Sequence, residues 1–219
     1  MIESDVSISR MSGTRERILD SAERLIAEQG YAATSLRQII AAAKVNIAAV
    51  HYHFGAKEDL LDAVVLRKVA PVNAARMEWL DRVEAQAGAG PLRIEDVLES
   101  FLLPTADTAQ QNPDFVRLMG RMLTEGMMPS LVEKHFQATV MRFSAALSRA
   151  IPYLPRQELM WRVHFMIGAT AHAMSMKPIL SGMEGDAPDM NLRMRRLVTF
   201  LAAGFRAPSN AALPESKEK

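Results

Sequence analysis

Two histidines and a tyrosine stand together in the segment NIAAVHYHFGAKEDLL, residues 46–61. Imidazole groups bind metals and transfer protons, so the spacing of His51 and His53 decides whether they can act together. Side chains that face each other on one helix are three or four positions apart, whereas these two are two positions apart. They therefore cannot chelate one metal ion from one helix, and no serine or cysteine nucleophile signature accompanies them. We expect no catalytic residue, no metal site and no cofactor.

The same segment fits a surface that docks against DNA. On a helix of about 100° per residue, one side collects the apolar residues that we predict to face the core: Ile47, Val50 and Phe54. Ala48, Ala49 and Tyr52 point the opposite way. Small side chains let a helix enter the major groove, where alanine methyl groups can contact thymine methyl groups. The alternative is plain exposed surface, although a solvated face usually carries Glu, Lys and Gln.

The elements around this segment are all predicted to be helices. Apolar residues recur at helical spacing over 14–29 and again over 34–43, where Thr34 or Ser35 would cap the helix. The break AKVN separates the second helix from the third, which spans 47–54. Two helices joined by such a break form a helix-turn-helix, in which the second helix reads the groove.

Composition sets limits on the class of protein. The chain has 219 residues, 49% of them hydrophobic, so it can bury a sizeable core. It has no cysteine, which excludes disulfides and thiolate metal sites and fits a reducing cytosol. We find no signal peptide and no apolar run that would span a membrane, and we expect a cytoplasmic protein.

The net charge of the chain is only +1, so the overall charge gives no support to DNA binding. The distribution of charged residues along the chain does support it. From Gln29 to Lys57 there is no Asp or Glu, while Arg37 and Lys44 lie within this window. A surface that faces phosphates needs such a window free of acids.

The segment TSLRQIIAAAKVNIAAVHYHFGAKEDLL, preceded by TRERILDSAERLIAEQGYAAT, resembles the TetR family of dimeric transcriptional repressors. The family pattern runs roughly T-x-x-x-I-A-x-x-A-G-V-S-x-x-x-x-Y-x-H-F-x-x-K-x-x-L, and the resemblance covers about residues 12–72. It implies an N-terminal helix-turn-helix DNA-binding domain whose contact residues are Thr34, Ser35, Arg37, Lys44, Asn46, Ala48, Ala49, His51, Tyr52, His53 and Lys57. Lys57 would clamp a phosphate.

Two positions depart from the family pattern. Lys44 stands where the family has its turn glycine, and it must adopt an unusual backbone conformation at a cost of about 1 kcal/mol. His51 replaces the first tyrosine of the usual pair, which leaves its contact with DNA open.

Beyond residue 72 the chain shows longer helical patterns and no strand-like alternation. We therefore predict an all-α protein: a flexible arm over 1–11, a three-helix DNA-binding domain over 12–72, a larger ligand-binding and dimerisation domain over 73–207, and a disordered tail over 208–219.

The last two long helices, about 156–180 and 190–205, are the predicted dimer seam. In the resembled family such a pair forms a four-helix bundle with its twin, and a two-fold dimer would read two half-sites of a palindromic operator. The seam residues are Trp161, Gly168, His172, Met176, Leu197 and Leu201. Alternatively, these side chains face the core of their own chain.

The middle helices, 97–151, are rich in Met and Phe, which suits a pocket for a lipophilic molecule as well as an ordinary core. The predicted pocket residues are Phe101, Met119, Met122, Phe143 and Phe165. Arg121, Glu125, His164 and His172 lie within apolar runs and are candidates to orient a ligand, although for the two histidines a satisfied position in the core or at an interface is favoured over a ligand contact.

The expected function is a homodimeric DNA-binding regulator, a repressor released by a small lipophilic effector. One alternative is a helical ligand-binding or scaffold protein without DNA binding. Another is a helical enzyme that acts on a lipophilic substrate, for which we find no acid/base or metal constellation.

Overall fold

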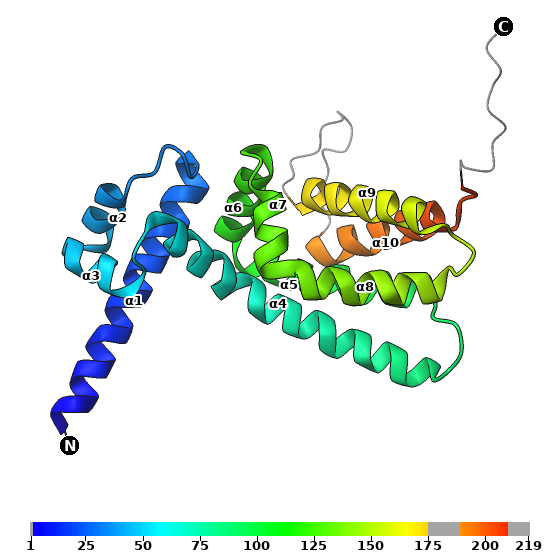
Figure 1. Cartoon of the computed structure of the whole chain (residues 1–219), viewed down its shortest axis with the longest axis horizontal. Coiled ribbons are helices and arrows are strands. Elements are labelled where there is room, and N and C mark those ends of the chain that lie inside the picture. Colours follow the sequence, from blue (N-terminus) through cyan, green and yellow to red (C-terminus); the bar gives the residue numbers. More distant parts are fainter. Residues whose placement is uncertain (1, 175–188, 210–219) are drawn as a thin grey trace, which may run out of the picture. The chain divides into compact units, whose positions relative to one another are not determined.

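The computed structural model describes residues 2–174 and 189–209, with residues 2–12 as backbone alone, and all regular elements in these ranges are helices (Figure 1). In chain order they are α1 (Ile2–Gln29), α2 (Leu36–Ala43), α3 (Ile47–His53), α4 (Lys57–Ala87), α5 (Ile94–Gln111), α6 (Pro113–Thr124), α7 (Met128–Leu131), the π-helical turn η1 (Val132–Phe136), α8 (Gln137–Ala150), α9 (Arg156–Met174) and α10 (Met190–Arg206). The prediction of an all-α protein is confirmed. Within the described ranges, no helix has the length and apolarity that crossing a membrane requires.

The chain divides into two compact units. Unit 1 comprises Met1–Pro71 and Asn112–His135, and unit 2 comprises Val72–Gln111 and Phe136–Lys219. Helix α4 belongs to both, and unit 1 gives way to unit 2 at Pro71 inside this helix. A proline has no backbone N–H, so α4 lacks one helical hydrogen bond at the residue where the units divide.

Helix α1 begins at Ile2, so it includes residues 2–11 of the segment predicted as a flexible arm. The predicted stripe is in place from Ile18 onward: Ile18, Leu19, Ala22 and Ile26 are all buried. Extending a formed helix costs less than starting one, so the long buried part of α1 favours helix in the preceding residues as well.

Local hydrogen bonds start the two short helices of unit 1. Ser35, not Thr34, is the N-cap of α2, and it forms a capping box with Gln38. The Asn46 Oδ1 atom accepts a hydrogen bond from the Ala49 N–H at 2.8 Å and starts α3. Such caps satisfy backbone N–H groups that a helix leaves without partners in its first turn.

Unit 1 also contains a segment from the middle of the chain. Helix α6 packs against α1 and buries Phe115, Leu118 and Met122. The predicted division into 12–72 and 73–207 therefore separates segments that belong to one compact unit. Sequence order alone gave no sign of this, because the amphipathic pattern of α6 does not say which partner covers its apolar face.

Unit 2 has its own core, built from buried side chains of α5, α8, α9, α10 and the C-terminal part of α4. Arg162 on α9 is 8% exposed and joins α9 to the end of α10. Its guanidinium donates to the carbonyl oxygens of Gly204, Phe205 and Ala207 at 2.8–2.9 Å and to that of Pro208 at 3.1 Å. Its Nη2 atom also lies 2.8 Å from a carboxylate oxygen of Glu158.

The pair formed by Glu84 and Arg142 makes the stability of unit 2 depend on pH. The hydrogen bond from Arg142, at 2.6 Å, lowers the pKa of Glu84 below its ordinary value of 4.5, against an opposing effect of burial. A carboxylate whose pKa is lowered by folding stabilises the folded state above its unfolded pKa, and this contribution is lost as pH falls through the lowered value. We expect Glu84→Gln to reduce the melting temperature at pH 6–7, and the difference from wild type to shrink toward pH 3.

Thermal unfolding followed by circular dichroism between about pH 3 and pH 7 measures this difference. Glu78→Gln is the matched control, since Glu78 pairs with Arg82 at 3.9 Å through well-exposed side chains, and such pairs contribute little. A difference between Glu84→Gln and wild type that stays constant with pH would contradict the assignment.

Candidate nucleic-acid interface

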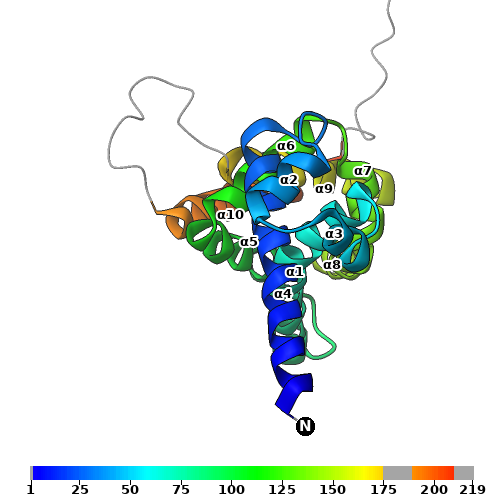
Figure 2. The same cartoon turned by 90° about the vertical axis from the view of Figure 1, so that its left-hand side faces the viewer.

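The outer face of α3 is open to solvent, as predicted. Tyr52 is 72% exposed and its ring meets the His53 ring edge-on at 5.2 Å between centroids. Ala48 is exposed and Ala49 half-buried, whereas Val50 lies fully inside the core of unit 1. In Figure 2, α2 and α3 lie toward the viewer. The face therefore combines two small side chains with an aromatic one that can donate a hydrogen bond.

Ile47 does not face the core, contrary to the prediction. It is 57% exposed, while Val50 and Phe54 on the same stripe are 0% and 8% exposed. Side chains on a helix lean toward its N-terminus, so the first residue of the seven-residue α3 leans past the end of the helix. Ile47 thus adds an apolar group to the exposed surface beside Ala48.

Lys44 adopts the strained backbone conformation that its place in the turn predicts. It is the C-cap of α2 with φ 53° and ψ 50°, in the left-handed region that favours glycine. Its N–H donates to the carbonyl of Ala41 at 3.3 Å, and its side chain is exposed. The long cationic side chain is therefore presented beside the helix-turn-helix at some cost in stability.

We expect Lys44→Gly to raise the free energy of unfolding by up to about 1 kcal/mol, because glycine adopts this conformation without strain. If Lys44 contacts a phosphate, the same variant also lowers the slope of log affinity against log salt by about one. Chemical denaturation and fluorescence anisotropy on duplex DNA measure the two effects. Arg37→Gly, on the exposed side of α2, is the control that should destabilise the protein.

The predicted DNA contact of Thr34 needs correction. Its side chain is 1% exposed, and its hydroxyl donates to the Gly30 carbonyl at 2.7 Å while accepting from Gln29 at 3.1 Å. A hydroxyl enclosed in this way presents no donor to a phosphate. Ser35, Arg37 and Asn46 are exposed, with Ser35 and Asn46 also serving as caps.

Lys57 is held more firmly than the resemblance implies. Its ammonium donates to the Tyr31 carbonyl at 2.6 Å and lies 3.9 Å from the centroid of the Tyr31 ring. The Tyr31 hydroxyl in turn donates to Glu58 at 3.0 Å, and burial together with this carboxylate raises the pKa of Tyr31 to about 12. Lys57 therefore fixes the loop after α1 and keeps its remaining N–H bonds for other acceptors.

His51 is exposed, and its Nδ1 atom lies 3.1 Å from the Gly55 carbonyl oxygen. Because a carbonyl only accepts, this bond places the proton on Nδ1 and leaves Nε2 as the ring nitrogen that can approach DNA. Among the described residues, no group of three His, Asp or Glu side chains is placed to hold a metal ion.

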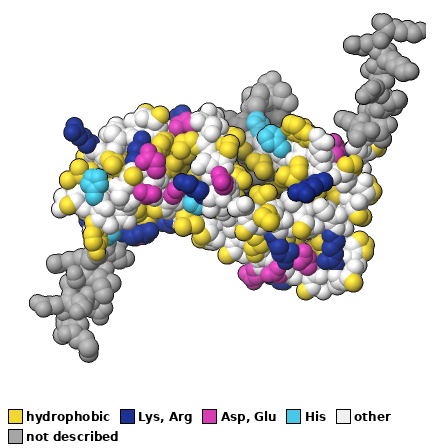
Figure 3. All heavy atoms as spheres, viewed as in Figure 1, with side chains coloured by type: hydrophobic (Ala, Val, Ile, Leu, Met, Phe, Trp, Pro, Cys, Tyr) yellow, Lys and Arg dark blue, Asp and Glu magenta, His cyan; other side chains and the backbone are white. Residues whose placement is uncertain are grey.

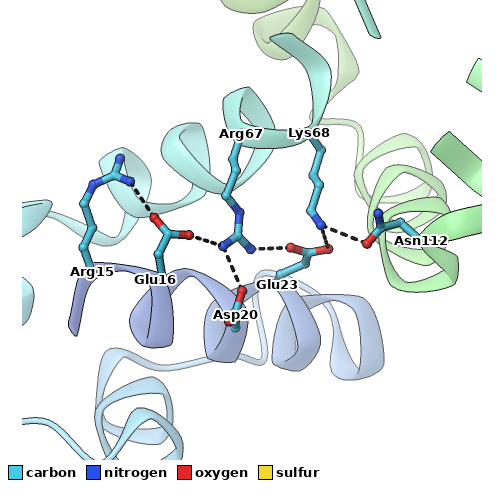
Figure 4. Close-up of polar contacts among 7 residues, drawn as sticks. All are labelled: Arg15, Glu16, Asp20, Glu23, Arg67, Lys68 and Asn112. Carbon is cyan, nitrogen blue, oxygen red and sulfur yellow. Dashed lines mark hydrogen bonds and ion pairs between the residues drawn. The ribbon is translucent and has the colours of Figure 1, made fainter. Parts of the chain in front are cut away.

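A network of ion pairs joins α1 to α4 in unit 1 (Figure 4). The Arg67 guanidinium contacts the carboxylates of Glu16, Asp20 and Glu23 at 2.9, 2.8 and 2.6 Å. Burial alone would lower the pKa of Arg67, but the three carboxylates more than offset this and raise it. Lys68 extends the network from Glu23 to the side chain of Asn112, which precedes α6.

Arg121 and Glu125, which were expected to orient a ligand, instead fasten α6 to the end of α1. Arg121 donates to the Glu28 carbonyl at 3.1 Å, and Glu125 accepts from the Tyr31 N–H at 3.2 Å. Gly30, with φ +90°, ends α1 here, and a Cβ atom on it would collide with the Glu125 carboxylate. The left-handed backbone conformation therefore favours glycine here, and any larger residue would also displace the Glu125 carboxylate.

Arg17 is a basic residue near the interface that the sequence did not single out. Together with Lys44 it lines a shallow groove beside the turn after α2, and its Nε atom donates to the Ala43 carbonyl at 3.4 Å. The acidic residues Glu16 and Asp20 obscured it in the sequence. The absence of acids from 29–57 was a useful signal, but it could not include a residue that only the fold brings to the turn.

The predicted pocket residues are divided between the two units. Phe101 and Phe143 meet edge-on in unit 2, with ring centroids 5.0 Å apart. Met119 and Met122 lie on α6 in unit 1, where Met122 is fully buried. Phe165 is 62% exposed on α9, so it lines no enclosed pocket. Composition identified adaptable apolar residues, but it could not say which of them share a core.

Most described residues of the predicted dimer seam lie on the surface. Trp161 is 53% exposed and its ring stacks on that of Phe165 at 5.9 Å, and Gly168 and His172 are exposed on the same helix. Figure 3 shows apolar side chains gathered on the face that α8 and α9 turn toward the viewer. His164, for which a core or interface position was favoured over a ligand contact, is also exposed here.

On α10 the prediction needs correction. Leu201 is 6% exposed and belongs to the core of its own unit, and Leu197 is half-buried. Phe200, the neighbouring position, is 72% exposed. Met176 lies outside the described residues. Neighbouring positions on a helix differ by about 100°, so a choice between 200 and 201 needs the packing that only the structure gives.

Two family models match this chain. Residues 18–64 match the model described as "Bacterial regulatory proteins, tetR family", and residues 97–204 match "Tetracyclin repressor-like, C-terminal domain". The chain is 52% identical over 48 residues to the HTH-type transcriptional repressor Rv3405c of Mycobacterium tuberculosis and 45% identical over 51 residues to the regulator AcrR of Shigella flexneri. These matches cover 22% and 23% of this chain and span 26% and 24% of the relatives.

Solved structures resemble the whole fold at low sequence identity. A regulatory protein of the tetR family from Rhodococcus RHA1 has a TM-score of 0.64 at 18% identity, covering 90% of this chain and 98% of the other. The fatty acid degradation regulator FadR from Bacillus halodurans has a TM-score of 0.61 at 15% identity, covering 89% and 97%. At such identities the likeness shows the fold alone.

Proposed function

Because this chain belongs to the TetR family of transcriptional regulators, we propose that it is a cytoplasmic homodimer that binds a palindromic DNA operator through α3. In this proposal it represses transcription until a small lipophilic effector binds unit 2. The observation that carries the DNA-binding part is the outward face of α3, where Ala48, Ala49 and Tyr52 stand over the buried Val50. The proposed contacts are Ser35, Arg37, Lys44, Asn46, Ala48, Ala49, His51, Tyr52, His53 and Lys57, with Arg17 added and Thr34 left out.

The dimer in this proposal forms through α9 and α10. Three apolar aromatic side chains are exposed there, namely Trp161, Phe165 and Phe200. An exposed cluster of aromatic residues is typical of an interface, since aromatic side chains contribute much of the energy of association. Two copies joined by a two-fold axis would present two α3 helices to the two halves of a palindrome.

The effector acts in this proposal by binding one conformation of the dimer more tightly than the other. A ligand that bound the DNA-bound and DNA-free forms equally well would release nothing, however tight its binding. The Phe101–Phe143 pair in unit 2 supports an apolar site, since Phe101 is only partly buried beside the core.

Fluorescence anisotropy with a duplex from the region upstream of the gene tests the proposal. We expect specific binding that weakens steeply between about 50 and 200 mM salt, because phosphate contacts release counterions. A scrambled duplex should bind far more weakly, with a similar dependence on salt. Absence of binding to either duplex at about 50 mM salt would refute the proposal and favour a ligand-binding or scaffold protein without DNA binding.

Phe200→Glu tests the dimer separately. We expect the dissociation constant of the dimer to rise by about 30-fold or more, because a buried carboxylate would replace an aromatic contact on each side of a two-fold interface. Sedimentation velocity at several protein concentrations measures it. Tyr153→Glu, at a side chain 64% exposed in the loop before α9, is the control that should leave the dimer intact. Equal dissociation constants for wild type and Phe200→Glu would exclude α10 from the interface.

A further inference from the structure

Arg76 on α4 is a buried cation in unit 2 that no carboxylate of a described residue neutralises. It is 5% exposed, and the three groups that accept hydrogen bonds from its guanidinium are all neutral. Its Nε atom donates to the Phe101 carbonyl at 2.9 Å, Nη1 to the Asn73 side chain at 3.1 Å, and Nη2 to the Thr105 hydroxyl at 2.6 Å. The guanidinium carbon lies 3.9 Å from the centroid of the Phe101 ring.

Two other arginines with several hydrogen bonds show the contrast, because each of them has a carboxylate partner. Arg67 contacts three carboxylates, and the buried Arg162 has Glu158 and the carbonyls at the end of α10, where the helix dipole is negative. Burial lowers the pKa of Arg76 to about 9, so the group still carries its charge at pH 7. A buried charge without an opposite charge is unfavourable, and such groups in proteins are normally paired.

The surroundings of Arg76 have the chemistry of a site for an anionic head group. An arginine binds carboxylate or phosphate through two parallel N–H bonds, and three of its five N–H bonds are engaged here. The Asn73 side chain accepts from Arg76 through its amide oxygen, and the Thr105 hydroxyl accepts from Arg76 while it donates to the Phe101 carbonyl at 3.4 Å. Phe101 joins this polar group to the apolar core, since its ring lies over Arg76 on one side and meets Phe143 on the other, and it is only partly buried.

We propose that Arg76 binds the anionic head group, a carboxylate or a phosphate, of an amphiphilic effector whose apolar chain lies along Phe101 and Phe143. This inference rests on the proposed function, because it names the chemical class of the effector in unit 2. The other role open to Arg76 is structural: its bonds to Phe101 and Thr105 also join α4 to α5. A purely structural role gives no preference for a charged ligand, which makes the two roles separable.

Isothermal titration calorimetry on the full chain with dodecanoate, dodecyl phosphate and dodecanol tests the proposal. We expect wild type to bind at least one of the two anions at least tenfold more tightly than the alcohol, and Arg76→Gln to bind all three alike. The stronger of the two anions identifies the head group. Arg149→Gln is the matched control, because Arg149 donates to the carbonyls of Gly88 and Gly90 in the same unit. It should keep the preference of wild type.

Equal binding of the acid, the phosphate and the alcohol by wild type would overturn the proposal. So would a preference that persists in Arg76→Gln. If Arg76→Gln does not fold, Arg76→Lys replaces it: this variant keeps the charge without the planar fork, and we expect it to retain the preference at weaker overall affinity. Loss of the head-group preference in Arg149→Gln would assign the preference to another cation, and it would also contradict the role proposed for Arg76.

The same protein preparations are tested for DNA binding, so that two failures can be told apart. Normal binding to the upstream duplex without any head-group preference refutes the role of Arg76 alone. A clear head-group preference without DNA binding refutes the proposed regulatory function. The role of Arg76 in binding the head group then stands.

Discussion

Ala48→Glu is expected to reduce the affinity for the operator by about 100- to 1000-fold. The carboxylate would stand on the outward face of α3, where the proposed complex places a major groove lined by phosphates on both sides. A like charge forced into such an interface costs several kcal/mol, and every 1.4 kcal/mol is a factor of ten. Folding should be nearly unaffected, because Ala48 is exposed and supports no core contact.

The measurement is fluorescence anisotropy with the upstream duplex at a fixed salt concentration, accompanied by a thermal unfolding curve. Ala70→Glu is the matched control, since Ala70 is exposed on α4 in the same unit and lies outside the proposed interface. It adds the same charge to unit 1 and should change the affinity by only a small factor. Wild-type affinity in Ala48→Glu would show that α3 does not enter the groove.

Arg162→Met is expected to lower the free energy of unfolding by about 3–5 kcal/mol. The substitution keeps an apolar stem but removes the guanidinium that donates to four carbonyl groups at and beyond the end of α10. Buried acceptors left without partners, and Glu158 left without its cation, each add to the loss. The melting temperature should fall by roughly 10 °C.

Differential scanning calorimetry or urea denaturation measures this loss. Arg195→Met on α10 is the control: Arg195 pairs with Glu99 at 3.5 Å through a side chain that is 58% exposed, and such a pair contributes less than about 1 kcal/mol. If both variants unfold alike, the bonds of Arg162 do not fasten α10, and unit 2 depends on its apolar core alone.

Helical periodicity correctly predicted which side of α3 faces outward. It did not predict the exposure of residues at the ends of helices. The spacing of residues 47–54 placed Tyr52 outward and Val50 inward, and the structure agrees. Periodicity failed at Ile47, the first residue of α3, and the resemblance failed at Thr34 before α2, because the face of a helix is defined only where neighbours lie along it. Whether a terminal side chain is covered depends on the loop and helix beyond it.

Roles that depend on distant segments were beyond the reach of the sequence. Arg121 and Glu125 were polar residues in an apolar run, a pattern equally consistent with a ligand and with the end of α1, which lies more than ninety positions away. Lys44 shows the opposite case. Its left-handed backbone conformation was predicted from the resemblance, in which this turn position is a glycine, and the structure has φ 53° there.

The two-part composition of unit 1 limits how this protein can be recombined with its relatives. A chimera that exchanged only residues 1–71 would separate α1 from α6, and the side chains that α6 buries, Phe115, Leu118 and Met122, would meet a foreign helix. Grafting the DNA specificity of this chain onto another regulator therefore requires two inserts, 1–71 and 112–135, transferred as a matched pair.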